Sequence, residues 1–385
     1  MSPTAADYNA SGTLTATHQY NPLEQIQSQT LPTGAAHFHH HDQTHRQRRH
    51  LPDQLGLHRL RPGHRHQHRP QPTRQSLYLH RQVHRPHHPR RRLRPARPQQ
   101  LSPASDNTVQ RRQGSQPAVG PDGTVYVVWE ESGEQVVATS ADGGTSWSRP
   151  VTAGPVADIQ DPIPGANFRT DSFTSIAADP RTGSTTVWLA WVNRTADGGR
   201  VVVTHSADRG RTWAPLTTVS TAAEGYAFFQ GLDVAPNGRV DVAYQGLTAK
   251  DPTTYGTGNA AINTWYTGKA DGGSWTTPIR TSSAPSDPAA GAQNNLARQF
   301  WDDYSTLVST DDHAWFIDTD SRHGADCPVV DAFQHQVEGT APAQEDDDAV
   351  GGGTTAADGP AAPAPSLDCP RQFGNTDAYV SVITP

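Results

Sequence analysis

The sequence predicts an all-β protein built from repeated antiparallel units. After residue 113, apolar strand-like runs alternate with Gly, Asn and Asp turns, which are the strongest short signals of β-hairpins. An octapeptide of the form Ser-x-Asp-x-Gly-x-Thr-Trp recurs at the ends of these runs, with Ser146 in place of the threonine in one copy. The runs are rich in Val, Thr, Trp and Tyr, and no capped run with a 3.6-residue period exceeds two turns. Four strands in each unit, repeating roughly every 40–50 residues, are typical of β-propeller blades.

Residues 1–36 are polar, and we expect them to supply one edge strand at most, around Pro22 and Ile26. We interpret this segment as the remnant of a blade. Its first thirty residues contain neither the basic nor the apolar region of a secretory signal peptide. No run in the chain approaches the ~20 apolar residues of a membrane-spanning helix, so no membrane span is predicted.

Between residues 37 and 112 the composition changes abruptly. This window holds 14 of the 19 histidines and 17 arginines against three acidic residues, a formal charge of +14 in a chain of net charge −7. Its few apolar residues follow no period and cannot bury enough surface to offset chain ordering, so we predict disorder. Three interpretations remain open: an arm that binds polyanions, a His-rich metal-binding tract, and a segment translated out of frame. We favour the third because the composition shifts sharply at both edges.

The predicted blades occupy residues 113–385, where four similar segments each form a hairpin. These segments span residues 118–129, 176–191, 232–244 and 307–318. Three of them end in an aligned aromatic residue, namely Trp129, Trp191 and Tyr244. Each of the first three is followed by a further strand and then by a copy of the octapeptide or a shortened form of it. This order of elements predicts four-stranded units.

The octapeptide contains residue types that suit a tight hairpin. In the copy at residues 206–213, Asp208 can accept hydrogen bonds from the following backbone N–H groups, and Gly210 can adopt a positive φ. Ser206 can bind back to the loop, and Trp213 offers a large apolar surface to the returning strand. We therefore predict structural roles for the repeated residues. They are Ser140, Asp142, Gly144 and Trp147 in one copy, Ser206, Asp208, Gly210 and Trp213 in the next, and Asp271 and Trp275 in the shortened third.

The end of the chain combines a flexible insertion with two cysteines. Residues 337–366 are rich in Ala, Gly, Pro and acidic residues, which predicts a flexible loop. Cys327 and Cys369 flank it, and a disulfide between them would close a loop of about forty residues and contribute about 3–4 kcal/mol. The alternative is two free thiols. A disulfide would place the protein in an oxidising compartment, hence outside the cell. Residues 377–383 alternate as a final strand.

The octapeptide resembles the Asp-box, also called the bacterial neuraminidase repeat, of sialidase-like β-propellers. The resemblance covers about 270 residues from Gly114 to the C-terminus, about four of the six blades that the family has. It implies a secreted exo-α-sialidase type of glycoside hydrolase. The alternative is a non-catalytic propeller that binds glycans or a cell-surface partner. Asp-boxes lie on the rim of such propellers, so they indicate fold more strongly than function.

The family binds the carboxylate of sialic acid with three arginines and uses a Tyr nucleophile, a Glu and an acid/base Asp. The nearest match to its first arginine motif is Phe168-Arg169-Thr170-Asp171, in which Thr and Asp replace the usual Ile and Pro. This match also follows an octapeptide instead of preceding the first one. The candidate catalytic residues are Arg169, Asp171, Arg298, Tyr304 and Arg322, the last three by position only.

Each of these candidates has a structural alternative. For the arginines it is a surface or strand-edge ion pair, and for Tyr304 it is a packed aromatic residue. Glu224 and Tyr226 supply a further Glu and Tyr at a blade entrance. Because the motif departs from its usual form and about two blades are missing, we expect weak or no sialidase activity. We predict no cofactor, no metal, no specific nucleic acid partner, a glycan or glycoprotein as partner, and a secreted monomer.

Overall fold

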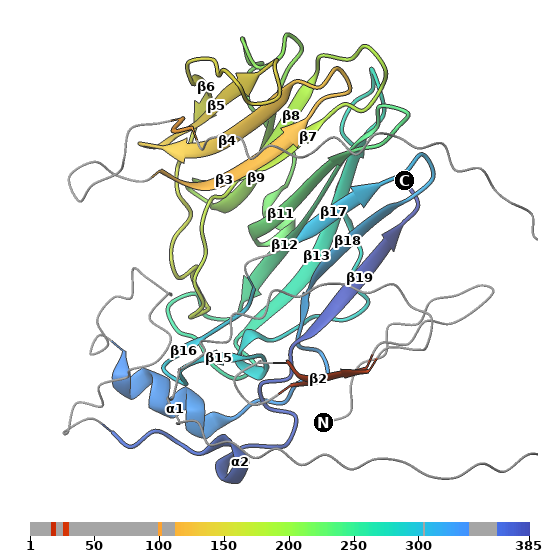
Figure 1. Ribbon diagram of the computed structural model, residues 1–385. Helices are drawn as coiled ribbons and strands as arrows, with labels where there is room; N and C mark the ends of the chain where they lie inside the picture. The colour runs from red at the N-terminus through yellow and green to blue at the C-terminus, as the bar shows by residue number, and fades with distance from the viewer. Residues whose placement is uncertain (1–16, 21–25, 31–98, 102–111, 303–304, 339–359) are drawn as a thin grey trace, which may run out of the picture. The chain divides into compact units, whose positions relative to one another are not determined.

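The computed structural model describes residues 17–20, 26–30, 99–101, 112–302, 305–338 and 360–385 (Figure 1). Contacts divide the chain into two units, residues 1–31 with 98–385 and residues 32–97. The second unit lies outside the described residues. Nearly all of the His- and Arg-rich window and most of the predicted acidic loop also lie outside them. The disorder expected for the window and the flexibility expected for the loop therefore stay predictions.

The described chain is almost entirely β, as its sequence predicts, and forms three four-stranded antiparallel sheets in sequence order. The first contains β3 (Arg112–Val119), β4 (Val125–Glu131), β5 (Glu134–Ser140) and β6 (Val151–Pro155). The second contains β7 (Ser175–Ala178), β8 (Val187–Thr195), β9 (Gly198–Ser206) and β10 (Thr217–Thr218). The third contains β11 (Tyr226–Val234), β12 (Val240–Ala249), β13 (Ala260–Lys269) and β14 (Ile279–Arg280).

A three-stranded sheet follows, made of β17 (Thr306–Ser309), β18 (Ala314–Asp320) and β19 (Asp377–Ile383). The short pair β15 (Gln293–Asn294) and β16 (Arg298–Gln299) precedes it. The first strands of the four larger sheets are neighbours in order, with β3 beside β7, β7 beside β11 and β11 beside β17. Successive meanders whose first strands lie side by side are the arrangement of propeller blades.

Strand β8 shows how the core joins consecutive sheets. Its side chains alternate between two faces, as the period of a β-strand requires. Leu189 and Trp191 join a cluster with residues of the first sheet, whereas Ala190 and Val192 join one with residues of the third. Both faces of this strand are buried, which explains its nearly continuous apolar run.

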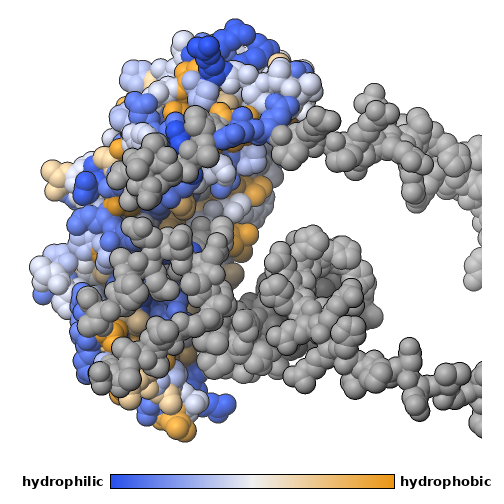
Figure 2. Space-filling view, turned by 60° about the vertical axis from the view of Figure 1, so that its left-hand side comes forward, coloured by the Kyte–Doolittle hydropathy of each residue, from blue (hydrophilic) through white to orange (hydrophobic). Residues whose placement is uncertain are grey.

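The fourth sheet is buried on one face only. Leu307 and Phe316 pack against Ala243 and Tyr266 of the third sheet. On the other face Val308, Ile317, Val380 and Val382 are 52%, 43%, 51% and 63% exposed. Figure 2 shows one side of the molecule, where hydrophilic residues lie between small apolar patches.

Two elements differ from the sequence-based expectation. Residues 1–36 contain two paired strands, β1 (Thr17–Tyr20) and β2 (Ile26–Thr30), where we expected one edge strand at most. Helix α1 (Pro328–Val337) is longer than any helix expected. Its N-cap residue Cys327 makes no side-chain capping hydrogen bond, so a polar N-cap is absent, although Pro328 stands at the first helical position. The shorter helices are η1 (Ala222–Glu224), η2 (Pro288–Ala290) and α2 (Pro365–Asp368).

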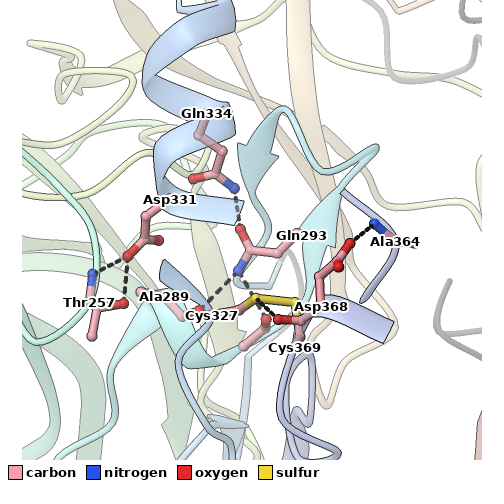
Figure 3. Close-up of a disulfide and its surroundings, with 10 residues drawn as sticks. Thr257, Ala289, Gln293, Cys327, Asp331, Gln334, Ala364, Asp368 and Cys369 are labelled. Atoms are coloured by element: carbon pink, nitrogen blue, oxygen red, sulfur yellow. Dashed lines mark hydrogen bonds between the residues drawn. A yellow bond between two sulfur atoms is a disulfide. The ribbon is translucent and has the colours of Figure 1, made fainter. Parts of the chain in front are cut away.

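A disulfide joins Cys327, before α1, to Cys369, after α2, as the spacing of the two cysteines predicts (Figure 3). Its Cα atoms are 5.2 Å apart. Polar contacts hold α1 to neighbouring loops: Gln334 donates to Gln293 at 2.5 Å, and Asp331 accepts from the backbone of Thr257 at 2.7 Å. Among the described residues, no helix has the length and apolar character needed to cross a membrane.

Candidate functional site

The two full octapeptides form the same hydrogen-bonded turn, between the third and fourth strands of their sheets. In the first, the Ser140 hydroxyl donates to Asp142 at 2.8 Å and accepts from the Gly144 N–H at 2.8 Å. Asp142 also accepts from the backbone and the hydroxyl of Ser146, which holds the pKa of this carboxyl at about 2.

The second copy repeats these contacts atom for atom. Ser206 donates to Asp208 at 2.7 Å and accepts from the Gly210 N–H at 2.8 Å. The hydroxyl and backbone of Thr212 donate to Asp208 at 2.7 and 2.9 Å and lower the pKa of its carboxyl. Each turn therefore satisfies its own backbone donors, and its acidic residue is engaged by the turn itself.

The shortened third copy uses its acidic residue differently. Asp271 forms an ion pair with Arg181, which lies in the turn between β7 and β8 and also binds Asp179 at 2.7 Å. Trp275 pairs with Lys269 across the hairpin. The sequence places Asp271 in the motif but gives no sign that its partner comes from another sheet.

A long loop between β6 and β7 carries two of the predicted site residues. Phe168 in this loop is fully buried, with its ring 5.5 Å from that of Phe228 and 6.1 Å from that of Trp301. The next residue, Arg169, is only partly buried, and its guanidinium lies 6.0 Å from the ring centre of Phe300. The buried aromatic contacts therefore fix the positions from which Arg169 and Phe300 extend.

The same loop brings a second predicted arginine alongside. Arg298 makes an ion pair with Asp161 at 2.5 Å. Asp161 also accepts from the backbone N–H of Thr170 at 3.2 Å, and Asn167 N–H donates to the side chain of Gln299 at 2.8 Å. Two candidate arginines, Arg169 and Arg298, are thus on segments that contact each other. Asp161, which sequence reasoning missed, binds Nη2 of Arg298, while Nε of Arg298 has no hydrogen-bond partner among the described residues.

The third predicted arginine, Arg322, lies just after the end of β18. Nε and Nη2 of Arg322 bind both carboxylate oxygens of Asp320, and Nη1 donates to Ser283 at 2.6 Å. Its guanidinium also lies 4.2 Å from the ring centre of Tyr379. These contacts use both sides of the planar fork that would bind a ligand carboxylate. Tyr304 lies outside the described residues, so its role stays a prediction.

Asp171 belongs to an acidic group that the sequence does not reveal. It accepts from Gln113 at 3.0 Å, and its ligand oxygen lies within 4.8 Å of those of Glu130 and Asp158. Glu130 is buried, and Gln135 lies directly opposite it on the next strand. Clustered carboxylate oxygens and an amide oxygen are ligands that Ca²⁺ accepts, so these residues could hold a divalent cation.

A buried Tyr–Glu pair is present, but it is not the one expected. Tyr244 donates to Glu224 at 3.4 Å, and both side chains are buried. Burial, and then the charge of Glu224, raise the pKa of Tyr244. Tyr226 instead accepts from the backbone N–H of Gln160 at 3.1 Å. The pair therefore lies in the protein core, where it supports packing and does not face a ligand.

No family model and no curated protein sequence matches this chain. Among solved structures it is similar to the Hadza microbial sialidase Hz136, with 14% identity and a TM-score of 0.34 over 55% of this chain and 43% of the sialidase. It is similar to the NanB sialidase from Streptococcus pneumoniae, with 12% identity and a TM-score of 0.30 over 55% and 27% of the two chains. It is also similar to the GH93 α-L-arabinofuranosidase of Fusarium graminearum, with 15% identity and a TM-score of 0.32 over 56% of this chain and 58% of the enzyme. The chain spans less than half the length of either sialidase.

Proposed function

We propose that this protein is a sialidase-like Asp-box propeller that binds glycans and does not turn over sialosides. The identical hydrogen-bonded turns at Asp142 and Asp208 support the Asp-box assignment, because both occupy the same place in consecutive four-stranded sheets. The surface formed by the charged residues Asp161, Arg169 and Arg298 and the aromatic Phe300 supports glycan binding. Charged and aromatic groups side by side suit a ligand with hydroxyl groups and apolar ring faces.

We base the proposed absence of sialidase turnover on one observation, the hydrogen bonds that the candidate arginines already make to aspartates of the same chain. Nε and Nη2 of Arg322 are both bound to Asp320, so this guanidinium presents no open pair of donors, and Nη2 of Arg298 is bound to Asp161. A sialidase needs three open guanidinium forks on one carboxylate, and losing one preorganised donor at a catalytic site costs about 3 kcal/mol, or roughly a hundredfold in rate.

The acidic group offers a second candidate function, hydrolysis of a different glycoside. The oxygens of Glu130, Asp158 and Asp171 lie within 4.8 Å of one another. Retaining glycosidases hold two carboxyl groups about 5 Å apart, and carboxylates grouped this closely supply such a pair. In this proposal the buried Glu130 is the acid, and a partly exposed Asp is the nucleophile.

A glycan microarray probed with the full chain tests the binding function. We expect retention of a defined set of glycans, and at least about tenfold weaker retention of Arg169→Ala. The matched control is Arg280→Ala, because Arg280 is exposed on the outer strand β14. No retained glycan, or equal loss in both variants, would refute binding at this surface. Release of sugar from a panel of chromogenic glycosides that Asp171→Asn abolishes would favour the second candidate.

Secretion is also part of the proposal, and the disulfide supports it. Cys327 and Cys369 are the only cysteines in the chain, and persistent disulfides are characteristic of oxidising compartments. Thiol titration of the unfolded, unreduced protein isolated from culture medium should find no free thiol. Two free thiols, or recovery of the protein in the cytoplasmic fraction alone, would contradict it.

A further inference from the structure

A cavity of about 290 Å³ lies between the second and third sheets, at their outer strands. It is lined by Trp188, Val203, His205, Ala214, Pro215, Leu216, Thr217, Lys269 and Trp275. The lining comes from β8, β9, β10, β13 and the shortened third turn. None of these residues belongs to the arginine-bearing loop or to the acidic group.

Aromatic rings form the walls of this cavity. The Trp188 ring is stacked on that of His205, with the ring centres 4.4 Å apart. Trp275 stands nearly perpendicular to Trp188, at 85° and 6.4 Å. Both tryptophans are partly buried, so they pack on the core and still border the cavity. Two perpendicular indoles cannot sandwich a flat aromatic ring, but they can line two sides of a puckered one.

The polar groups of the cavity have hydrogen-bonding capacity left. The Lys269 ammonium lies 6.0 Å from the ring centre of Trp188, and no carboxylate of the described residues forms an ion pair with it. Its nearest acidic neighbour in the turn, Asp271, is bound to Arg181. Within the described chain, the side chains of His205 and Thr217 likewise make no hydrogen bond to another protein group.

The surroundings of His205 favour its neutral form. Burial, and then the charge of Lys269, lower the pKa of its imidazole. A neutral imidazole can donate one hydrogen bond and accept another. The cavity thus combines one positive charge, a neutral donor and acceptor, a hydroxyl and two indoles.

We propose that this cavity binds an acidic pyranose residue, a sugar ring that carries a carboxylate. The carboxylate pairs with Lys269, the ring hydroxyls bond to His205 and Thr217, and an apolar ring face lies on Trp275. The inference uses the proposed function only for the ligand class, since the site is separate from the arginine surface.

Other ligand classes fit these groups less well. A quaternary ammonium ion, which aromatic cages often bind, would be repelled by Lys269. A simple aromatic carboxylate would leave the partly buried His205 without a partner, and a buried polar group left unpaired weakens binding. An inorganic anion would use the ammonium but not the indoles.

The chain contains only two lysines, Lys250 and Lys269, which allows an internally controlled experiment. The full chain is acetylated with an amine-reactive ester in the presence of methyl β-glucuronide, and the rate at each lysine is read by mass spectrometry. With ligand at ten times its Kd, we expect acetylation of Lys269 to slow about tenfold. The exposed Lys250 should react at an unchanged rate.

Two matched probes and a matched variant decide the result. Methyl β-glucoside, which lacks the carboxylate, and sodium acetate, which lacks the sugar ring, should give no protection at the same concentration. Binding of the glucuronide beside Trp188 and Trp275 should change the tryptophan fluorescence. Lys269→Met should abolish this change, and Lys250→Met should keep it. Equal protection by acetate, or no protection by the glucuronide, overturns the proposal. If the microarray still shows glycan binding, the proposed function stands without this site.

Discussion

The arginines of the candidate site and the lysine of the outer cavity use their charges in opposite ways. Arg322 binds both oxygens of Asp320 and is further held by Ser283 and Tyr379. Lys269 lies over an indole and has no carboxylate partner in the described chain. A cation that is bound by its own protein stabilises the fold, whereas one without a partner is available to a ligand.

Burial explains the difference. The side chains of Asp320 and Arg322 are 5% and 14% exposed, so each charge needs the other once it leaves water. Asp161 and Arg298 are 46% and 31% exposed, and their pair is correspondingly weaker. Lys269 is partly exposed, so water can satisfy its ammonium until a ligand displaces it. The position of a cation relative to the core therefore indicates its role better than its residue type.

The largest expected effect comes from breaking the buried pair. Asp320→Ala leaves the Arg322 guanidinium buried without its carboxylate, and we expect a loss of about 3 kcal/mol in the free energy of unfolding. Urea unfolding measures this loss. The double variant Asp320→Ala with Arg322→Met should recover part of it, because no unpaired charge remains. Unchanged stability of the single variant would contradict the role given to the pair.

The neighbouring carboxyl of Asp318 gives a pH test. Burial raises its pKa to about 7, although Thr264 and Gln245 donate hydrogen bonds to it. The folded protein therefore binds a proton that the unfolded chain releases near pH 4. We expect this contribution to stability to be complete below pH 4, to fall as the pH rises toward 7, and to be absent in Asp318→Asn. If the free energy of unfolding of Asp318→Asn depended on pH in the same way as that of the parent, this prediction would be refuted.

The exposed pair at the loop should matter less for stability. Asp161→Ala removes the partner of Arg298, and we expect a loss below about 1 kcal/mol. The change also opens the guanidinium, so retention of sialylated glycans on a microarray should increase. Reduced retention would show that Asp161, and not Arg298, contacts the glycan.

The smallest effect is expected at the cavity. Lys269→Met removes a charge that no described carboxylate binds. The free energy of unfolding, measured by thermal unfolding, should therefore change by no more than about 0.5 kcal/mol. A loss above about 2 kcal/mol would assign Lys269 a structural role and remove the contrast with Arg322.

Local features of the fold were predictable from the sequence. The turns at Asp142 and Asp208 satisfy their own backbone donors within five residues, so their residue types suffice to identify them. The pairing of Cys327 with Cys369 follows from there being no other cysteine. The ion pair of Arg322 also had a local signal, because Asp320 lies only two residues earlier and also accepts from the backbone N–H of Arg322.

The site itself depends on contacts between distant segments, which explains why the sequence revealed little of it. Asp161 and Arg298 are 137 residues apart, and Arg181 and Asp271 are 90 apart. The acidic group joins Glu130 of β4 to two residues of a later loop. Neither a hydrophobic period nor a sequence motif marks pairs of residues that are so far apart in the chain. Helix α1 was missed although it is local, because Cys327 is not a polar N-cap and only Pro328 marks its start.

The central claim, a sialidase-like propeller without sialidase turnover, is tested most directly by release of a fluorophore from a sialic acid glycoside. The purified full chain should release none above the uncatalysed background, because Asp320 closes the fork of Arg322 and Asp161 binds Nη2 of Arg298. Turnover above roughly 1 s⁻¹ that disappears in Arg169→Ala would contradict the claim and establish the protein as an active sialidase.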